Sequence, residues 1–324
     1  MHRLWVLRAL GAMLAMGICA CGSSPAIDPI SVAVSTPLPP GASVVQGPPS
    51  ESATPATCDP TVSLKPGITP LPGAMPTGTS LAAIAERGRL IVGVDQNTYL
   101  FGFRNPRTGE LEGFDIDIAK EIAKAIFGDP TRIEERALTS AERIPALQNG
   151  TVDIVVRTFS ITCARLEQVA FSSVYYQAQQ RILVPPHSEI SGAGDLDGKT
   201  VCATTGSTSL NHLLALSPAP KVLAVHDWSD CLVALQQGQA DAVSTDDSIL
   251  LGIKAQDPNL QLVGTSLSPE PYGIGIRKDD TVLVRFVNGV LDELRRNGGW
   301  KRIYSTWLGA SSVPDPPTAN YRDG

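Results

Sequence analysis

The sequence lacks the short motifs by which many enzymes and metal-binding proteins are recognised. It contains no Gly-x-Ser-x-Gly turn, no P-loop, no Gly-x-Gly-x-x-Gly fingerprint and no pair of carboxylates at catalytic spacing. It also has no Cys-x-x-Cys pair or Cys/His cluster, so a structural metal site is not expected. His187, His212 and His226 have no catalytic partner adjacent in sequence. These absences favour binding over catalysis, and no cofactor is expected.

An excess of positive charge is absent as well. The 324 residues carry a formal net charge of −6 at pH 7, which provides no basic field to attract nucleic acid. With 43% hydrophobic and 18% charged residues, the composition is that of an ordinary globular protein. The length allows roughly two domains at ~150 residues each.

The amino terminus has the pattern of an export signal rather than a membrane span. Arg3 and Arg8 accompany an apolar run over residues 9–18, which is too short to cross a bilayer. The segment "ICAC" (18–21) is similar to a bacterial lipobox, which predicts lipidation of Cys21. The alternative is an ordinary secretory signal followed by an incidental cysteine. Both predict an extracytoplasmic protein, and the first adds a lipid anchor in the cell membrane.

Residues 21–79 differ in composition from the rest of the chain. Half of the 26 prolines lie between Pro25 and Pro76, among many Ser, Thr, Gly and Ala residues. A segment of this composition has little apolar surface to bury, so we expect an extended and poorly ordered tether.

Four cysteines remain beyond the signal and the expected anchor. An even number in an exported protein suggests two disulfides, for which three connectivities exist. Cys202 and Cys231 lie within one stretch of alternating strands and helices and are the expected local pair. That leaves Cys58 with Cys163, a bond that would pin the end of the tether to the folded body.

From Ser80 onward, short apolar runs alternate with amphipathic helices, which predicts parallel sheets covered by helices. Asp115 is a plausible N-cap for the helix over 114–127. The predicted strands cover 89–95, 131–138, 151–156, 199–206, 221–227 and 240–246, and the other predicted helices cover 228–238, 283–294 and 298–309.

Two segments of the chain echo each other. "ALQNGTVDIV" (146–155) and "ALQQGQADAV" (234–243) agree at six kinds of residue, which predicts two similar lobes unless the likeness is chance. Thr158 and Asp246 would then both follow the carboxyl end of a strand, where open parallel sheets bind ligands. Two such edges facing each other would make a cleft.

Polar groups of both charges converge on this cleft. Arg157 and Arg165 cannot be deprotonated, so each requires water, a carboxylate or an anion. The segment "TTGSTS" (204–209) opens a helix whose first N–H groups favour an anion, although a plain turn with an N-cap serine is the alternative. Asp246 can accept from an ammonium, or it can cap the helix that follows. Together these groups are complementary to a zwitterion.

Aromatic residues follow the first predicted strand. The segment "QNTYLFGF" (96–103) supplies Tyr99, Phe101 and Phe103 at a position where an aromatic wall could line the cleft. Such residues belong to a core about as often as to a pocket.

Residues 90–309 resemble the bacterial extracellular solute-binding proteins of family 3, which serve polar amino-acid ABC importers; the resemblance is strongest to glutamine-binding lipoproteins of the GlnH type. The matching segments follow the family's order along the chain. They are "LIVGVD", "GELEGFDIDIAKEIAKAI", "IPALQNGTVDIV", "FSITCAR", "VAFSSVYY", "LDGKTVCATTGST", "ALQQGQADAVSTD", "EPYGIGIRKDD" and "KRIYSTWLG".

The resemblance implies an α/β, two-lobed, type II periplasmic-binding-protein fold. It implies that the two lobes are mainly parallel sheets flanked by helices, and the chain pattern places two hinge crossings near 181–190 and 268–277. The expected organisation is a signal peptide (1–20), the tether (21–79), lobe 1 (80–184 and 272–312), lobe 2 (185–271) and a C-terminal tail (313–324).

The implied function is capture of a polar amino acid by hinge closure and its delivery to an ABC importer permease. The protein is expected to be monomeric and not an enzyme. One alternative is an amino-acid sensor that presents its ligand state to a membrane signalling receptor. A second alternative is a dehydratase-like enzyme on the same fold.

Individual binding residues are implied by matching positions. Arg165 matches the arginine that clamps the ligand α-carboxylate, and Asp246 matches the acid that pairs with the α-ammonium. Either Tyr99 or Phe101 matches the stacking aromatic. The other implied ligand-binding residues are Asn97, Thr158, Ser160, Gly206, Ser207 and Thr208.

Two departures from the family pattern bear on specificity and stability. Arg157 stands where many relatives have a small residue, and it would bind a side-chain carboxylate, which favours aspartate or glutamate over glutamine or asparagine. The alternative for Arg157 is a salt bridge at the rim of the cleft. Cys163 and Ala164 replace the usual Pro-Glu pair, consistent with a local disulfide.

Overall fold

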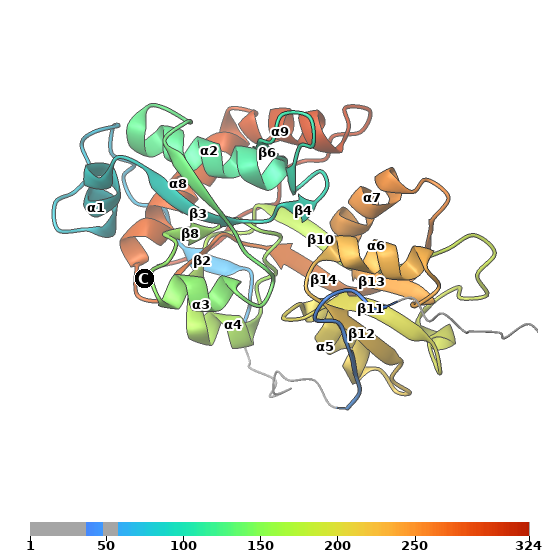
Figure 1. Ribbon diagram of the computed structural model, residues 1–324. Coiled ribbons are helices and arrows are strands. Elements are labelled where there is room, and N and C mark those ends of the chain that lie inside the picture. Colours follow the sequence, from blue (N-terminus) through green and yellow to red (C-terminus); the bar gives the residue numbers. More distant parts are fainter. Residues whose placement is uncertain (1–36, 48–57, 324) are drawn as a thin grey trace, which may run out of the picture. The chain divides into compact units, whose positions relative to one another are not determined.

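A computed structural model describes residues 37–47 and 58–323 (Figure 1). These residues form four sheets, of which the two largest have separate hydrophobic cores and the two smallest are β4-β5-β6 and β16-β2. Within these ranges, every helix is too short or too polar to cross a bilayer. The predicted signal peptide and Cys21 lie outside the described residues.

The first sheet has five strands in the order β7-β3-β8-β15-β9, with β3 parallel to β7 and β8. All of β3 is buried, as expected for a parallel strand that is covered on both faces. Helices α2, α8 and α9 lie on one face, and α3 and α4 on the other (Figure 1). The elements are α1 (Ser80–Arg87), β3 (Leu90–Val94), β4 (Asn97–Thr98), β5 (Gly102–Arg104), β6 (Leu111–Glu112), α2 (Phe114–Phe127), β7 (Ile133–Ala137), α3 (Arg143–Gln148), β8 (Ile154–Val155), α4 (Cys163–Gln168), β9 (Val169–Phe171), β15 (Gly275–Arg277), α8 (Thr281–Arg296) and α9 (Gly299–Leu308).

The second sheet has six strands in the order β1-β12-β11-β13-β10-β14. Its central strands β12, β11 and β13 are parallel, and their carboxyl ends point the same way. The elements are β1 (Ser43–Val45), β10 (Tyr176–Val184), η1 (Ala193–Asp195), β11 (Thr200–Thr204), α5 (Thr208–Ala215), β12 (Lys221–Val225), α6 (Trp228–Gln236), β13 (Ala242–Asp246), α7 (Asp247–Gln256) and β14 (Gln261–Tyr272).

Helix α2 forms because isoleucines recur on one face and bury against the first sheet. The predicted N-cap is wrong. The cap is Gly113, whose φ of 136° favours glycine and whose missing side chain leaves room for the Phe101 carbonyl. Asp115 lies inside the first turn and is buried, where it holds a loop of the candidate site.

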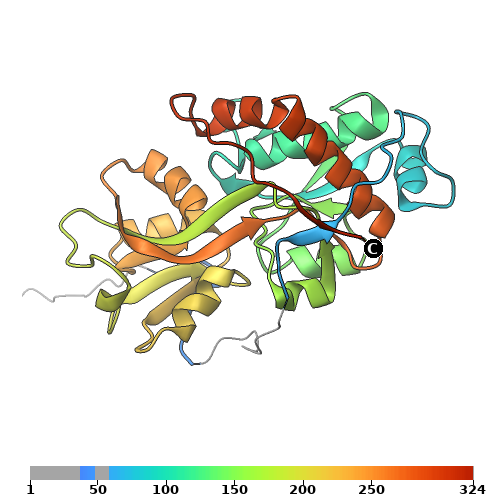
Figure 2. The same ribbon diagram turned by 180° about the vertical axis from the view of Figure 1, so that it is seen from behind.

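The two hinge crossings form one antiparallel ribbon. Strands β10 and β14 pair from Tyr176↔Tyr272 to Val184↔Gln261, and Figure 2 shows them running side by side from the second lobe to the first. The tyrosines pack in the first core, whereas Ile182 and other residues near the end of β10 pack in the second. The chain therefore enters the second lobe before residue 184, earlier than the sequence pattern indicated.

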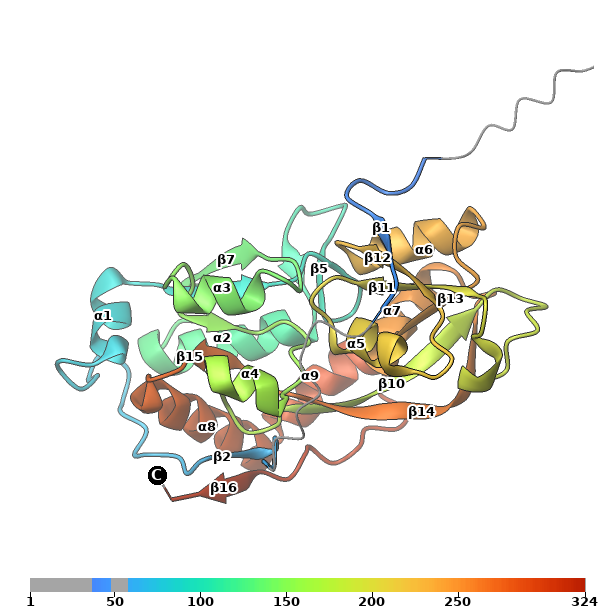
Figure 3. The ribbon, with the colours of Figure 1, turned by 90° about the horizontal axis from the view of Figure 1, so that it is seen from below.

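The described parts of the expected tether are not a free linker. Strand β1 pairs with β12, and β2 (Val62–Leu64) pairs in parallel with β16 (Asn320–Arg322) from the expected C-terminal tail (Figure 3). Ser63 also donates to the Phe171 carbonyl at 2.9 Å. The composition was misleading here because these strands are only three residues long and bury few side chains.

Both expected disulfides are confirmed. Cys202 and Cys231 join β11 to α6, and Cys58 and Cys163 join the segment before β2 to α4. The Cys58–Cys163 bond joins residues that are 105 positions apart in sequence, and it ties the segment before β2 directly to the first lobe.

Candidate functional site

A narrow cavity lies where the loops after β8, β11, β12 and β13 meet. It is lined mainly by hydroxyl groups, with one guanidinium and one carboxylate. The lining residues are Ser140, Arg143, Thr158, Ser160, Ser207, Thr208, Ser209, Trp228, Thr245, Asp246 and Ile249. Five of these residues were expected from the sequence, and they come from both lobes.

The loop after β8 is held in an unusual conformation at Thr158. Its φ of 37° lies in the left-handed region, which costs a non-glycine residue about 1–3 kcal/mol and persists only where the surroundings offset that strain. The Thr158 amide donates to Asp115 Oδ2 at 2.8 Å, and the Tyr175 hydroxyl donates to the other oxygen of that carboxyl at 2.8 Å. Burial raises the pKa of Asp115 to about 7.

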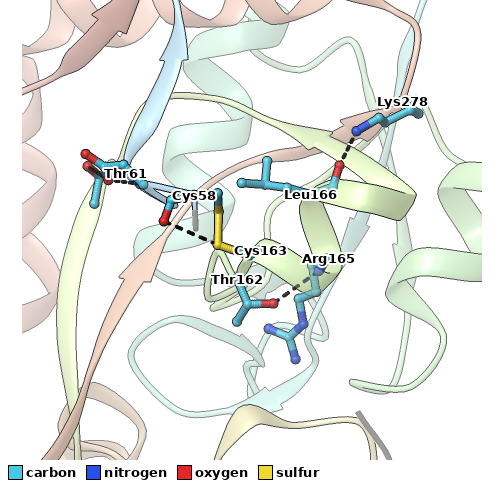
Figure 4. The surroundings of a disulfide bond; sticks show 8 residues. Cys58, Thr61, Thr162, Cys163, Arg165, Leu166 and Lys278 are labelled. Carbon is cyan, nitrogen blue, oxygen red and sulfur yellow. Dashed lines mark hydrogen bonds between the residues drawn. A yellow bond between two sulfur atoms is a disulfide. The ribbon is translucent and has the colours of Figure 1, made fainter. Parts of the chain in front are cut away.

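Arg165 lies at the junction of the two lobes. It belongs to the first turn of α4, where the Thr162 hydroxyl caps its amide at 3.1 Å and the neighbouring Cys163 is disulfide-bonded (Figure 4). Its Nη1 donates to Ser160 O at 2.7 Å and its Nη2 to Gly206 O, in the second lobe, at 3.0 Å. The side chain is buried, and neither Arg165 nor Gly206 is among the residues that line the cavity.

The start of α5 supplies hydroxyl groups from the second lobe. Ser207 is the N-cap, and its side chain accepts from the Leu210 amide at 3.1 Å. Thr208 donates to the buried Glu270 carboxylate at 2.8 Å. Gly206 has a φ of 77°, and a Cβ there would lie 2.7 Å from Ala141 Cα in the first lobe. Glycine is therefore required where these two loops touch.

Asp246 provides a carboxylate oxygen that no described residue satisfies. Its Oδ2 accepts from the Tyr272 hydroxyl at 2.5 Å, while its Oδ1 is buried with no hydrogen-bond partner among the described residues. Burial, followed by the charge of Glu270, raises the pKa of Asp246 well above its ordinary value. Asp246 is the N-cap residue of α7, as the alternative from the sequence expected, but its side chain makes no capping hydrogen bond. Such a group can accept a cationic donor.

The structure does not bring Arg157, which was predicted to contact a ligand, into the cavity lining. Its side chain is fully buried and forms an ion pair with Asp95, with 2.7 Å between Nη2 and Oδ2. The Arg157 Nε also donates to Leu138 O at 2.6 Å. Because side chains alternate along an extended chain, Arg157 points away from the side on which Thr158 lines the cavity.

The aromatic prediction also fails. Phe101 is fully buried in the first core, where it packs against Phe114 and Tyr176. Tyr99 is 37% exposed, and its ring meets Phe103 edge-on at 4.7 Å. Neither ring nor Asn97 lines the cavity. The aromatic residue that does is Trp228, from the second lobe.

Six lining residues were not expected from the sequence. Trp228 had a usable signal, because it follows the carboxyl end of β12 much as Thr158 follows β8. Arg143 had no such signal. It is the first residue of a helix, and its side chain bonds to the Thr158 carbonyl in a loop that comes later in the sequence. The others are Ser140, Ser209, Thr245 and Ile249.

Burial and two neighbouring arginines lower the pKa of Arg143 well below its ordinary value. Its guanidinium carbon lies 4.3 Å from the centroid of the Phe159 ring, and that of Arg165 lies 5.1 Å from the same centroid. Two guanidiniums therefore lie over the ring of Phe159. The described residues contain no group of three or more His, Cys, Asp or Glu side chains placed to hold a metal ion.

Comparison with known proteins gives consistent results. A family model described as bacterial extracellular solute-binding proteins, family 3, matches residues 90–310. The chain is 41% identical over 230 residues to the ABC transporter glutamine-binding protein GlnH of Bacillus subtilis (strain 168), which covers 71% of this chain and 84% of that protein. It is 33% identical over 248 residues to the glutamate-binding protein GluB of Corynebacterium efficiens, covering 72% and 84% of the two chains.

A solved structure supports the same conclusion. An ancestral arginine-binding protein bound to glutamine has a TM-score of 0.65 and 37% identity, over 69% of this chain and 99% of that one. The predicted two-lobed, type II fold is confirmed. The chain belongs to the bacterial extracellular solute-binding proteins, family 3.

Proposed function

We propose that this protein captures a polar amino acid between its lobes by hinge closure and delivers it to an ABC importer permease. Its relatives are amino-acid-binding proteins of transporters, and membership of an extracellular family places it outside the cytoplasm. The observation that carries the proposal is the unsatisfied Oδ1 of Asp246 in a cavity whose lining residue Ser160 accepts from the buried Arg165.

The proposed mechanism is charge pairing at both ends of the ligand backbone. The α-ammonium binds Asp246, which gains the cationic donor that its second oxygen lacks. The α-carboxylate binds the Arg165 guanidinium, with amide or hydroxyl donors from Ser160, Ser207 and Thr208 around it. Because these groups come from both lobes, binding favours the closed arrangement.

We propose aspartate or glutamate as the favoured ligand, with glutamine and asparagine as alternatives. Arg157 no longer supports this choice, since its charge is paired with Asp95. Arg143 does so through its charge, because its guanidinium lines the cavity although most of its N–H groups donate to backbone carbonyls. The named ligands of the relatives, glutamine and glutamate, belong to the same class.

Calorimetry with aspartate, glutamate, glutamine and asparagine tests the proposal. Arg165→Ala and Asp246→Ala are each expected to lose about 2–5 kcal/mol of binding free energy, because each leaves a buried partner charge unpaired. Asp247→Asn is the matched control, since Asp247 neighbours Asp246 and does not line the cavity. Wild-type affinity in both alanine variants would contradict the site.

The membrane partner and the lipid anchor at Cys21 belong to the proposal as well. Co-purification with a permease supports import, whereas co-purification with a signalling receptor would favour the sensor alternative. Absence of turnover with candidate hydroxylated substrates would remove the dehydratase alternative, for which no separate proton donor aimed at a leaving group is evident among the described residues.

A further inference from the structure

The Arg143 side chain donates hydrogen bonds to four backbone carbonyls, none of which pairing with a ligand charge would require. Its Nε donates to Ser140 O at 2.9 Å, and its Nη1 donates to Arg157 O at 3.2 Å and Thr158 O at 3.1 Å. Its Nη2 donates to Gly206 O, in the other lobe, at 3.2 Å. The side chain is 3% exposed, so water cannot readily replace these bonds.

The backbone of Thr158 is held on both sides of its Cα. Its N–H donates to the Asp115 carboxyl, and its carbonyl accepts from the Arg143 guanidinium. A threonine at a φ of 37° persists only where such contacts outweigh the backbone strain. Removal of either the Asp115 carboxyl or the Arg143 guanidinium is therefore expected to release this residue toward ordinary backbone conformations.

Gly206 is the point where Arg143 reaches the second lobe. The same carbonyl accepts from Arg165, so two guanidiniums of lobe 1 converge on one peptide of lobe 2. The absence of a Cβ lets this peptide approach Ala141, which lies between Ser140 and Arg143 in the sequence. The contact exists only when the lobes are together.

We propose that Arg143 is a positioning residue that couples closure of the two lobes to the conformation of the Thr158 peptide. The planar, forked guanidinium suits this role because it can donate to carbonyls of both lobes at once, which a lysine ammonium does not reproduce. The identity of the ligand rests on the proposed function. The coupling itself does not, because the contacts that carry it join protein groups only.

The first experiment needs no ligand. Hydrogen exchange of the peptide covering residues 152–161 is compared between the full-length wild type, Arg143→Gln and Arg143→Lys, with Arg136→Gln as control. Arg136 is an arginine of the same lobe that pairs with Glu134 away from the cavity. Exchange at Thr158 is expected to rise on the order of 10- to 100-fold in both Arg143 variants and to stay unchanged in the control. Unchanged exchange in Arg143→Gln would overturn the proposal, whatever the wild type binds.

The second experiment measures closure with saturating glutamate or aspartate by small-angle X-ray scattering. The wild type is expected to become more compact, while Arg143→Gln and Arg143→Lys bind more weakly and close less completely at the same fractional saturation. If the variants lose thermal stability but close as fully as the wild type, Arg143 is merely structural and the proposal is wrong. If the wild type binds no amino acid, the proposed function fails while the exchange experiment still decides the role of Arg143.

A double-mutant cycle separates the contact with the second lobe from the contacts within the first. Gly206→Ala pushes the Gly206 loop away from Ala141, so it weakens the same interlobe contact as Arg143→Gln. Their effects on affinity are expected to be clearly less than additive. Additive effects would show that Arg143 does not act through Gly206 and would overturn the coupling.

Discussion

Arg157 Nη2 lies 2.7 Å from Asp95 Oδ2, and both side chains are almost completely buried. The two residues follow β8 and β3, which are neighbouring parallel strands of the first sheet. The Arg157 Nη1 also donates to the Ser140 hydroxyl at 2.8 Å. This ion pair therefore holds together the loops that begin at the carboxyl edge of the sheet, behind the cavity lining.

We expect Arg157→Met to affect stability more than ligand choice. It leaves the Asp95 carboxylate buried without its cation, which typically costs about 3–5 kcal/mol. Chemical denaturation measures this loss, and Arg165→Met provides the contrast, with a larger effect on affinity than on unfolding. A fully stable Arg157→Met variant that lost only acidic ligands would instead restore a direct role for Arg157 in specificity.

The affinity for an amino acid is expected to rise with pH until Asp246 is ionised. Burial and Glu270 raise the pKa of Asp246 in this structure, and an ammonium bound to it would lower that pKa again. Binding then releases up to about one proton, because the complex favours the ionised carboxylate. Calorimetry in two buffers of different ionisation enthalpy counts the protons. The release should vanish in Asp246→Asn and persist in Asp247→Asn; equal release in all three proteins would exclude Asp246 as its source.

Local patterns were enough to predict the elements that position the site. Strand β3 is a short apolar run, β11 and β13 each contain a buried apolar pair, and α2 repeats isoleucine at helical spacing, so burial could be inferred from neighbours in sequence. Asp246 could be predicted because it ends a buried strand, and parallel strands deliver their carboxyl ends to one edge.

The misplaced residues depend on partners that are distant in sequence. Whether Arg157 faces a ligand depends on Asp95, and whether Phe101 lines a cleft depends on how it packs with Tyr176. Arg143 was missed for the same reason, because its carbonyl partners come from loops after two different strands. Sequence periodicity indicates that a residue is buried but does not identify what buries it.

The stability of the protein should depend on pH through Asp115. Its folded-state pKa of about 7 is above the ordinary value of 3.8, so the neutral carboxyl favours the folded protein. That contribution is complete below about pH 4 and is lost as pH rises through about 7, by roughly 4 kcal/mol at ~1.4 kcal/mol per pKa unit.

Urea denaturation of the wild type and Asp115→Asn between pH 4 and pH 8 measures this contribution. As pH rises, the unfolding free energy of the wild type should fall relative to that of Asp115→Asn. Because the Thr158 amide and the Tyr175 hydroxyl both bond this carboxyl, the variant should also bind amino acids more weakly. A difference in stability that is constant across this pH range would show that Asp115 does not titrate there.

The disulfide between Cys58 and Cys163 is expected to support both stability and binding. It closes 105 residues of sequence, against 29 for Cys202 and Cys231, and the chain-entropy model assigns the longer loop about 5 kcal/mol and the shorter about 4 kcal/mol. Cys163 begins α4, two residues before Arg165, so the bond also fixes the helix that carries this guanidinium. Cys58→Ser/Cys163→Ser should therefore unfold at lower denaturant than Cys202→Ser/Cys231→Ser and should lose more affinity for the amino acid. Equal affinity in the two double variants would show that α4 keeps Arg165 in place without the disulfide.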